Sequence, residues 1–320
     1  MNISKNLRKE FTPFFLLCLL SVALILNNFT SSVKSGVALF YGVVLPSVFP
    51  FFFITAYLSR LNITKRLFYK SHRFFNKVFS LSAESGFVVL ITLLSGYPSG
   101  AKLLSDFCEN NLISKEEAER ACSLASIPSP AFCILTLGGV ITNNTLFGVK
   151  AYLVCLISSF IVGLIFCKRK GAKLSQPKNS EIKDVSSAMY DSAYSAFSTA
   201  LMVGTLITLF YLFTDILSHY GLLLPVEKFF YFITKNENLS KSLTFGLIES
   251  TKGLKLLALE KENFLAFPLA CFMLGFSGVS IIFQSTTFLK KAKIKTAKFI
   301  LSKIVSAVLC FILGLIFNLF

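Results

Sequence analysis

The chain has 320 residues, of which 54% are hydrophobic and 15% charged, and its mean hydropathy is +0.69. Soluble domains carry about 25% charged residues, whereas several stretches here approach the about 20 apolar residues that cross a bilayer as a helix. The composition therefore excludes a pair of soluble domains and predicts one all-α polytopic membrane domain over residues 1–320.

The net charge of +16 raises the question of a nucleic-acid partner. The basic residues gather in short runs between apolar segments, at 5–9, 60–77, 168–183 and 290–298. This is the distribution of cytoplasmic loops in membrane proteins. We therefore expect no nucleic-acid partner, a lipid bilayer around the chain and a cytoplasmic N-terminus.

The sequence contains few residues that could form a metal site, a cofactor site or a nucleophilic catalytic site. The eight cysteines form no C-x-x-C pair, and the histidines are limited to His72 and His219. Buried, reduced cysteines are the simpler interpretation. We expect no metal, no cofactor and no enzymatic activity.

Hydropathy predicts about seven transmembrane helices. The second contains Pro46 and Pro50 and should be kinked. The first, following a basic start without a cleavage site, is interpreted as a retained extra helix within residues 1–35. Residues 60–85 are predicted to form an amphipathic surface helix or a connector, and 168–184 a cytoplasmic linker. The predicted spans are 11–29, 36–59, 121–142, 147–167, 186–217, 264–287 and 299–320.

Two further apolar segments, 86–108 and 241–260, are interrupted by polar or turn-forming residues, so that each arm is too short to cross. Such broken backbone is tolerated at membrane depth where it is buried in protein or lines an aqueous cavity. We expect two re-entrant hairpins.

The two hairpins share a short motif: Gly100-Ala-Lys-Leu-Leu104 matches Gly253-Leu-Lys-Leu-Leu257. Each is followed by a span with a second break, at 127–131 and 275–280. With the basic runs inside, the halves 36–167 and 186–320 have opposite orientations. Inverted repeats with interrupted segments in corresponding places are typical of secondary transporters, and the breaks point to the binding site.

A helix that begins inside the membrane exposes free N–H groups and a positive dipole end, which together favour an anion. Pro98 and Ser99 are predicted to begin such a helix, with Lys102 adding charge. Ser129 is predicted to begin a helix in the same way, and so are Ser277 and Gly278. The simpler alternatives are kinks without a site, a snorkelling Lys102 or Lys255, and a Glu249–Lys252 ion pair.

The acidic residues between 106 and 119 are expected to form a solvated connection, and Ser114 with Glu117 a capping box.

The strings SGYPSGAK, GLIESTKG and GFSGVSIIFQ, in this order, resemble the YlbJ family of sporulation integral membrane proteins, within the wider group that carries nucleoside-recognition (Gate) domains. The resemblance covers roughly residues 86–140 and 245–290. It departs at 126–130, where the family typically has asparagines. It implies movement of dipicolinate across a forespore membrane of an endospore-forming bacterium. From the residues and the resemblance together, the candidate substrate-binding residues are Ser95, Gly96, Tyr97, Pro98, Ser99, Gly100, Lys102, Ser129, Glu249, Thr251, Gly253, Ser277, Gly278, Ser280 and Gln284.

The leading hypothesis is a secondary transporter of a small organic anion. The alternatives are a transporter of nucleoside-like solutes and a non-transporting membrane protein of spore-envelope assembly. The expected partners are a small anionic or polar solute and the bilayer, and a homo-oligomer is compatible with the sequence.

Overall fold

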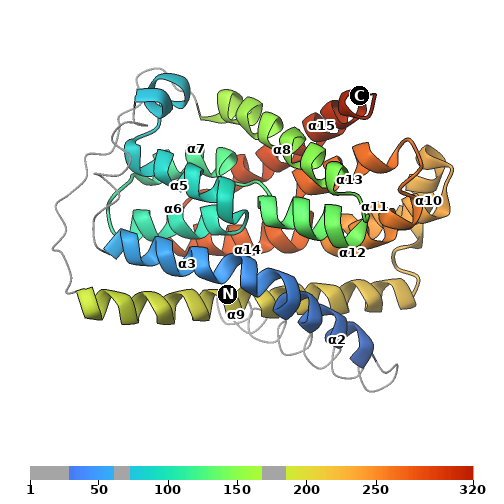
Figure 1. The fold of residues 1–320 in the computed structure, drawn as a ribbon, viewed down its shortest axis with the longest axis horizontal. Coiled ribbons are helices and arrows are strands. Elements are labelled where there is room, and N and C mark those ends of the chain that lie inside the picture. Colours follow the sequence, from blue (N-terminus) through green and yellow to red (C-terminus); the bar gives the residue numbers. More distant parts are fainter. Residues whose placement is uncertain (1–28, 61–72, 168–184, 320) are drawn as a thin grey trace, which may run out of the picture.

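The computed structural model describes residues 29–60, 73–167 and 185–319, and all regular structure in these ranges is helical (Figure 1). The predicted first span, the linker 168–184 and residues 61–72 of the predicted amphipathic segment lie outside the described residues. The all-α prediction is confirmed for the described part of the chain.

The first half begins with a helix that changes its hydrogen-bonding period. A five-residue π-helical segment joins α2 to α3, and Pro50 lies inside α3. A short helix, Arg73–Phe79, then meets α5 at 92°. The elements are α2 (Thr30–Leu39), η1 (Phe40–Val44), α3 (Leu45–Arg60), α5 (Ala83–Ser95), α6 (Ser99–Glu109), α7 (Lys115–Leu124), η2 (Ala131–Ile141, also π-helical) and α8 (Thr145–Phe166).

The second half begins with the 35-residue α9, which runs along the long axis of the molecule (Figure 1). Helix α10 was not predicted from the sequence. The elements are α9 (Val185–His219), α10 (Leu224–Thr234), α11 (Glu237–Ile248), α12 (Ser250–Leu257), η3 (Ala258–Glu260), α13 (Ala266–Phe276), α14 (Gly278–Lys291) and α15 (Ala297–Phe317).

Four stretches of the described chain are long and apolar enough to cross a membrane: α8, α9, the pair α13–α14 and α15. A fifth is obtained if Arg73–Phe79 and α5 count as one bent span. The expectation of about seven spans stays a prediction, because the search for spans covers the described residues alone and finds four or five among them. The predicted span 121–142 is divided, because α7 ends at Leu124 and η2 has only 11 residues.

The interrupted segments fold as helix hairpins. Ser82 begins α5 by accepting a hydrogen bond from the Ser85 N–H, and Gly96 ends it with a φ of 74°. Asn236 caps α11 in the same way through the Leu239 N–H, at 2.9 Å. An extended Glu249 separates α11 from α12. A capping side chain and a helix-breaking backbone thus define each first arm.

Connecting segments gather at two opposite ends of the molecule. At the basic end, Lys291 pairs with Glu109 at 3.6 Å and Lys298 with Glu119 at 3.2 Å. At the far end, the Lys261 ammonium donates to the Thr142 carbonyl at 3.2 Å. The α5–α6 hairpin therefore opens toward the basic end and the α11–α12 hairpin toward the far end.

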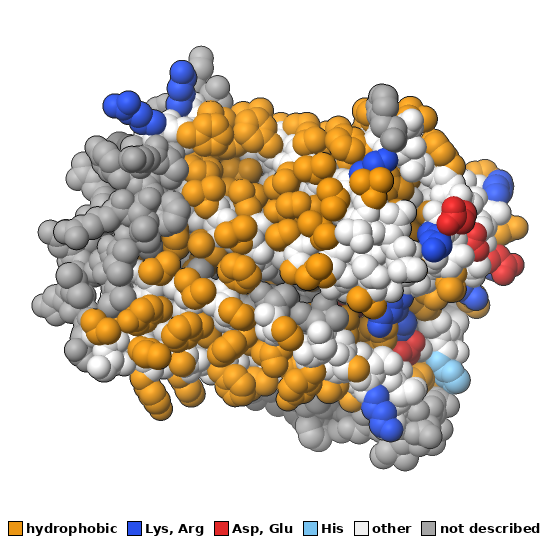
Figure 2. Space-filling model, in the orientation of Figure 1, with side chains coloured by type: hydrophobic (Ala, Val, Ile, Leu, Met, Phe, Trp, Pro, Cys, Tyr) orange, Lys and Arg blue, Asp and Glu red, His pale blue; other side chains and the backbone are white. Residues whose placement is uncertain are grey.

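The surface between these ends is apolar. On the face in Figure 2, hydrophobic side chains cover the middle, and most charged atoms lie toward the right-hand margin and the upper left. Exposed apolar residues recur every three or four positions on two of the long helices, which is one helical face. They are Leu153, Ile157, Phe160 and Leu164 on α8, and Leu301, Ile304, Val308 and Ile312 on α15. This belt is the surface expected to contact lipid.

Candidate functional site

The turns of both hairpins meet at a small buried cavity, which we call the central cavity. Its volume is about 60 Å³, about the space of two water molecules. Side chains from both halves line it: Val44, Ser95, Tyr97, Pro98, Ser129, Phe132, Val203, Ile207, Glu249, Ser250, Thr251, Ile281 and Gln284. Seven of the fifteen residues predicted from the sequence are among them.

In the first half, the hairpin turn is locked against the break at residues 125–130, between α7 and η2. The Tyr97 N–H donates to the Ile127 carbonyl at 2.8 Å. A Cβ on Gly96 would lie 2.4 Å from the Ser129 nitrogen, so only glycine permits this approach. Ser129 caps η2 by accepting from the Phe132 N–H at 3.1 Å, which confirms the predicted helix start at this position.

The second half repeats this arrangement with different residues. Ser277 has a φ of 71° and separates α13 from α14, as predicted for this break. A Cβ on Gly278 would lie 3.1 Å from the Ser250 nitrogen, where the second hairpin turns. Gly253 lies against Gly246, so the two hairpin arms touch through their backbones. Both halves thus bring a hairpin turn and a broken helix to the same place.

Two buried polar atoms at the central cavity have no hydrogen-bond partner, namely the Tyr97 hydroxyl and the Gln284 Oε1. The Gln284 amide nitrogen is 3.3 Å from the Ser280 hydroxyl, to which it donates. Buried polar groups are normally paired, and each exception calls for a reason such as an absent ligand. Because both residues line the cavity, one unpaired hydroxyl and one unpaired amide oxygen belong to its lining residues.

Glu249 is the charged residue in the cavity lining and is 2% exposed. Its carboxylate accepts from the Lys252 N–H at 2.8 Å and so caps α12. The N-terminal end of α12, where free N–H groups favour an anion, is therefore occupied by the chain's own carboxylate. The Lys252 ammonium does not pair with Glu249 but with Asp215 of α9.

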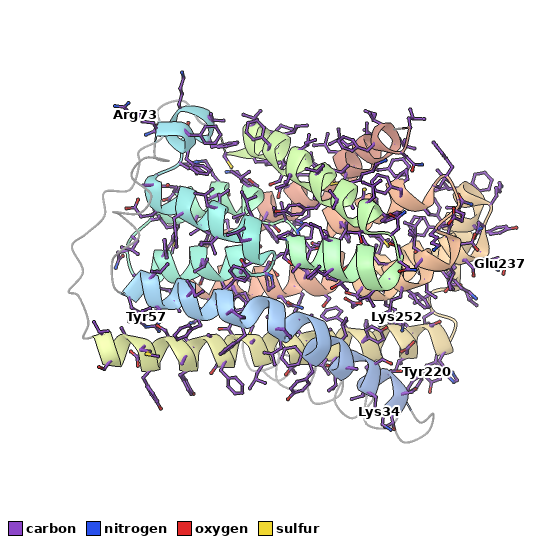
Figure 3. The ribbon with its side chains drawn as sticks, in the orientation of Figure 1. Lys34, Tyr57, Arg73, Tyr220, Glu237 and Lys252 are labelled. Atoms are coloured by element: carbon purple, nitrogen blue, oxygen red, sulfur yellow. The ribbon has the colours of Figure 1, made fainter. Side chains whose placement is uncertain are left out.

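Lys252 directly follows Thr251 of the cavity lining, and its ammonium contacts two aromatic rings. Its ammonium lies 4.8 Å from the Tyr211 ring centroid and 5.1 Å from that of Phe245. Figure 3 shows Lys252 beside α9, on the same side of the molecule as Tyr220 and away from Arg73. The Lys252–Asp215 pair joins the second hairpin to α9.

Several predicted residues lie beside the cavity rather than in its lining. Lys102 was expected to strengthen the positive end of α6, but its ammonium pairs with Asp106 one turn later. Ser99 is the first residue of α6 and bonds to the Gly96 carbonyl instead of capping the helix. Gly100 packs against the Ala125 carbonyl. The predicted residues outside the lining are Gly96, Ser99, Gly100, Lys102, Gly253, Ser277, Gly278 and Ser280.

The expectation of a solvated acidic connection is wrong for Glu117, which is fully buried. Its carboxylate accepts from the Ser82 N–H at 2.6 Å and the Ser85 hydroxyl at 2.8 Å. Ser114 accepts from the Glu117 N–H at 3.2 Å, as predicted. Glu117 therefore fixes the start of the first hairpin.

A larger and more open cavity, which we call the vestibule, lies toward the basic end, with a volume of about 590 Å³. Helix α9 contributes Met202 to the vestibule and the next residue, Val203, to the central cavity. Helix α14 does the same with Thr287 and Gln284. The two cavities are consecutive along these helices. The charged residues of the vestibule are Arg60, Lys102, Asp106, Asp191 and Lys291.

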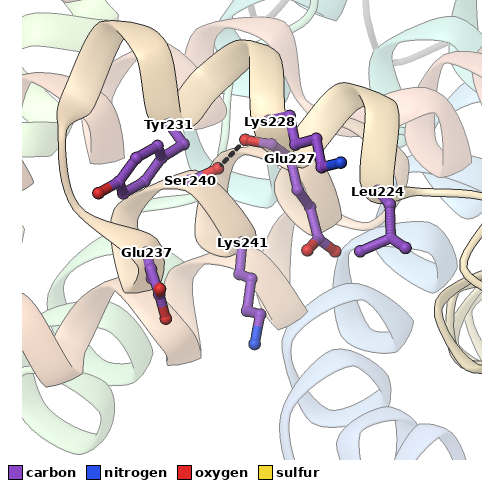
Figure 4. A pocket seen from close by; sticks show the side chains of 7 residues that line it. All are labelled: Leu224, Glu227, Lys228, Tyr231, Glu237, Ser240 and Lys241. Atoms are coloured by element: carbon purple, nitrogen blue, oxygen red, sulfur yellow. Dashed lines mark hydrogen bonds between the residues drawn. The ribbon is translucent and has the colours of Figure 1, made fainter.

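A third cavity, of about 320 Å³, lies between α10 and α11 (Figure 4). Its charged side chains have both signs, from Glu227, Lys228, Glu237 and Lys241, and the Ser240 hydroxyl donates to the Glu227 carbonyl. None of the helix breaks reaches it. We therefore place the candidate site at the central cavity.

Lys303 and Asp215 were missed by the sequence analysis, although both contact the hairpins or breaks. Lys303 lies more than one turn inside an apolar helix, and this was the available signal. Asp215 had none, because its partner is 37 residues away. Among the described residues, no cluster of three or more His, Cys, Asp or Glu side chains could hold a metal ion.

No family model matches the chain. The chain is similar to the sporulation integral membrane protein YlbJ of Bacillus subtilis (strain 168), with 26% identity over 338 aligned positions. The alignment covers 96% of this chain and 82% of that protein. This similarity supports the YlbJ family for the chain and agrees with its apolar, multi-helical structure.

Proposed function

We propose that this chain, which resembles a sporulation integral membrane protein over 96% of its length, is a secondary transporter of a small organic anion during endospore formation. Dipicolinate, the aromatic dicarboxylate implied by the family resemblance, is the first solute to test. The forespore membrane is the proposed location.

One observation carries the proposal: two hairpin turns and two broken helices converge on a buried polar cavity. Interrupted helices meeting at mid-membrane are the usual construction of a transporter binding site. Packing alone does not account for the unpartnered Tyr97 hydroxyl and Gln284 Oε1 in this cavity, since burying such a group costs about 1–3 kcal/mol.

The order of elements supports an inverted repeat with two re-entrant hairpins. In each half a long helical stretch is followed by a hairpin, a broken helix and a final helix. The hairpins open toward opposite ends of the molecule, as the contacts at Glu109 and Lys261 indicate. Alternating access would then move one hairpin-bearing unit against α9.

The central cavity is small in this conformation. Its volume of about 60 Å³ is far below the about 300 Å³ of a small-ligand pocket. A dicarboxylate would need the hairpin turns to separate. The vestibule, which carries Arg60, Lys102 and Lys291, is the proposed route from the cytoplasmic side.

A nucleoside-like solute is the second candidate, and the cavity lining favours it. The polar lining consists of hydroxyls, one amide and the carboxylate of Glu249, without a lysine or arginine. Such groups hydrogen-bond to hydroxyls and ring nitrogens. An anion would instead depend on Lys252 and the α12 N–H groups becoming available when Glu249 moves.

The test is uptake by the purified full-length protein in liposomes. Labelled dipicolinate and labelled uridine are each supplied with an ion gradient, and protein-free liposomes provide the background. Uptake of dipicolinate that unlabelled dipicolinate suppresses would support the anion proposal. Uptake of uridine alone would favour the second candidate.

No uptake of either solute by folded, correctly inserted protein would contradict this transporter proposal. In that case the third hypothesis, a non-transporting protein of spore-envelope assembly, predicts that Gln284→Leu still supports sporulation. A transporter with Gln284 in its site predicts a sporulation defect at normal protein levels.

A further inference from the structure

Lys303 is a lysine buried inside an apolar helix. It lies on α15, about 9 Å from the helix start at 1.5 Å per residue, and is 2% exposed. A lysine near a helix end usually extends toward the membrane surface. This one turns inward, and its ammonium donates to the Ser126 carbonyl at 3.0 Å.

The contact lies at the break between α7 and η2. Broken backbone inside a membrane must have each carbonyl satisfied by neighbouring groups. The Leu124 carbonyl accepts from the Ser159 hydroxyl at 3.0 Å, and the Ile127 carbonyl from the Tyr97 N–H at 2.8 Å. Lys303 supplies the partner for the Ser126 carbonyl, one of the two carbonyls between them.

The surroundings of Lys303 are suited to a cation. Carbonyls at the end of α7 carry the negative end of the helix dipole, and the Tyr97 ring centroid is 5.2 Å from the ammonium, within cation–π range. Within the described part of the chain, no carboxylate pairs with Lys303. Its other titratable neighbours are Cys155 and Cys310.

We propose that the Lys303 ammonium is a tethered cation in a monovalent-cation site formed by the Ser126 carbonyl and the face of Tyr97. Unwound carbonyls at such breaks coordinate Na⁺ in secondary transporters. Here the chain supplies the charge itself, so this break and the adjoining hairpin turn need no dissolved cation. The consequence for transport, independence from Na⁺ at this position, rests on the proposed function, whereas the cation site does not.

The test replaces the tethered cation and supplies a free one. Purified full-length protein, wild type and Lys303→Ala, is unfolded by heat in detergent with choline chloride, NaCl or methylammonium chloride at equal ionic strength. The wild type should have the same Tm in all three salts. Lys303→Ala should lose about 5 °C or more in choline, from the unpaired carbonyl and the lost charge, and recover at least half with Na⁺ or methylammonium.

Lys298→Ala is the matched control, because Lys298 lies on the same helix with a 53% exposed side chain. Its Tm should not depend on the cation. If Lys303→Ala cannot be purified, Lys303→Val, which also vacates the position of the ammonium, is measured in the same series.

Two results would overturn the proposal: an unchanged Tm for the Lys303 variant in choline, or a lowered Tm that neither Na⁺ nor methylammonium raises. The measurement needs no transported solute. Failure of the wild type to take up any solute would therefore count against the proposed function, while leaving the cation site to be decided by the Tm series.

Discussion

The Tyr97 hydroxyl carries the clearest prediction at the scale of single residues. It is buried without a partner in a residue that lines the central cavity, so it destabilises the protein, and a solute bound in the proposed site would give it a partner. Tyr97→Phe should leave the Tm unchanged or slightly raised. The same change should weaken solute binding about two- to tenfold, because one hydrogen bond contributes about 0.5–1.5 kcal/mol.

The two readouts are the Tm in detergent and the concentration for half-maximal uptake. Tyr231→Phe is the control, because Tyr231 is 47% exposed on α10, away from the cavity. A lower Tm for Tyr97→Phe with unchanged uptake would mean that the hydroxyl supports the fold rather than the solute.

The helix breaks were predictable because clusters of Gly, Pro and Ser favour turns and interrupt helices. The breaks at 96–98, 125–130 and 277 fall within the predicted segments. Helix α10 was missed because its 11 residues are too few for a membrane span. The Lys252–Asp215 and Lys303–Ser126 contacts were missed because they join distant elements, and one sequence does not reveal such pairs.

At the scale of elements, Gly96 tests how tightly the hairpin turn and the α7–η2 break are joined. Its φ is 74°, and a Cβ would lie 2.4 Å from the Ser129 nitrogen. Gly96→Ala should therefore lower stability by more than about 2 kcal/mol, the size expected for strain at a special backbone position. Thermal unfolding in detergent measures it.

Gly42→Ala is the matched control, because a Cβ there meets nothing within 4 Å. Its Tm should stay the same or rise, since Ala is favoured over Gly in helices by about 1 kcal/mol. Equal Tm values for the two alanine variants would show that the turn and the break are not in the close contact described above.

At the scale of the whole molecule, opposite hairpin directions and the clustering of basic loops should fix how the chain lies in the membrane. Asn111 follows the first hairpin at the basic end, and Glu262 follows the second at the far end; both are exposed. With basic loops on the cytoplasmic side, Glu262→Cys should react with an impermeant maleimide on intact cells. Asn111→Cys should react only after the membrane is permeabilised.

The parent protein gives the background, because all seven described cysteines are buried. Asn143→Cys and Lys293→Cys add a second pair, in exposed loops at the far and basic ends. If all four positions react from the sides opposite to those expected, the orientation is reversed while the inverted repeat stands. If Asn111→Cys and Glu262→Cys react from the same side, the hairpins do not enter from opposite faces, and a binding site built from two opposed turns loses its structural basis.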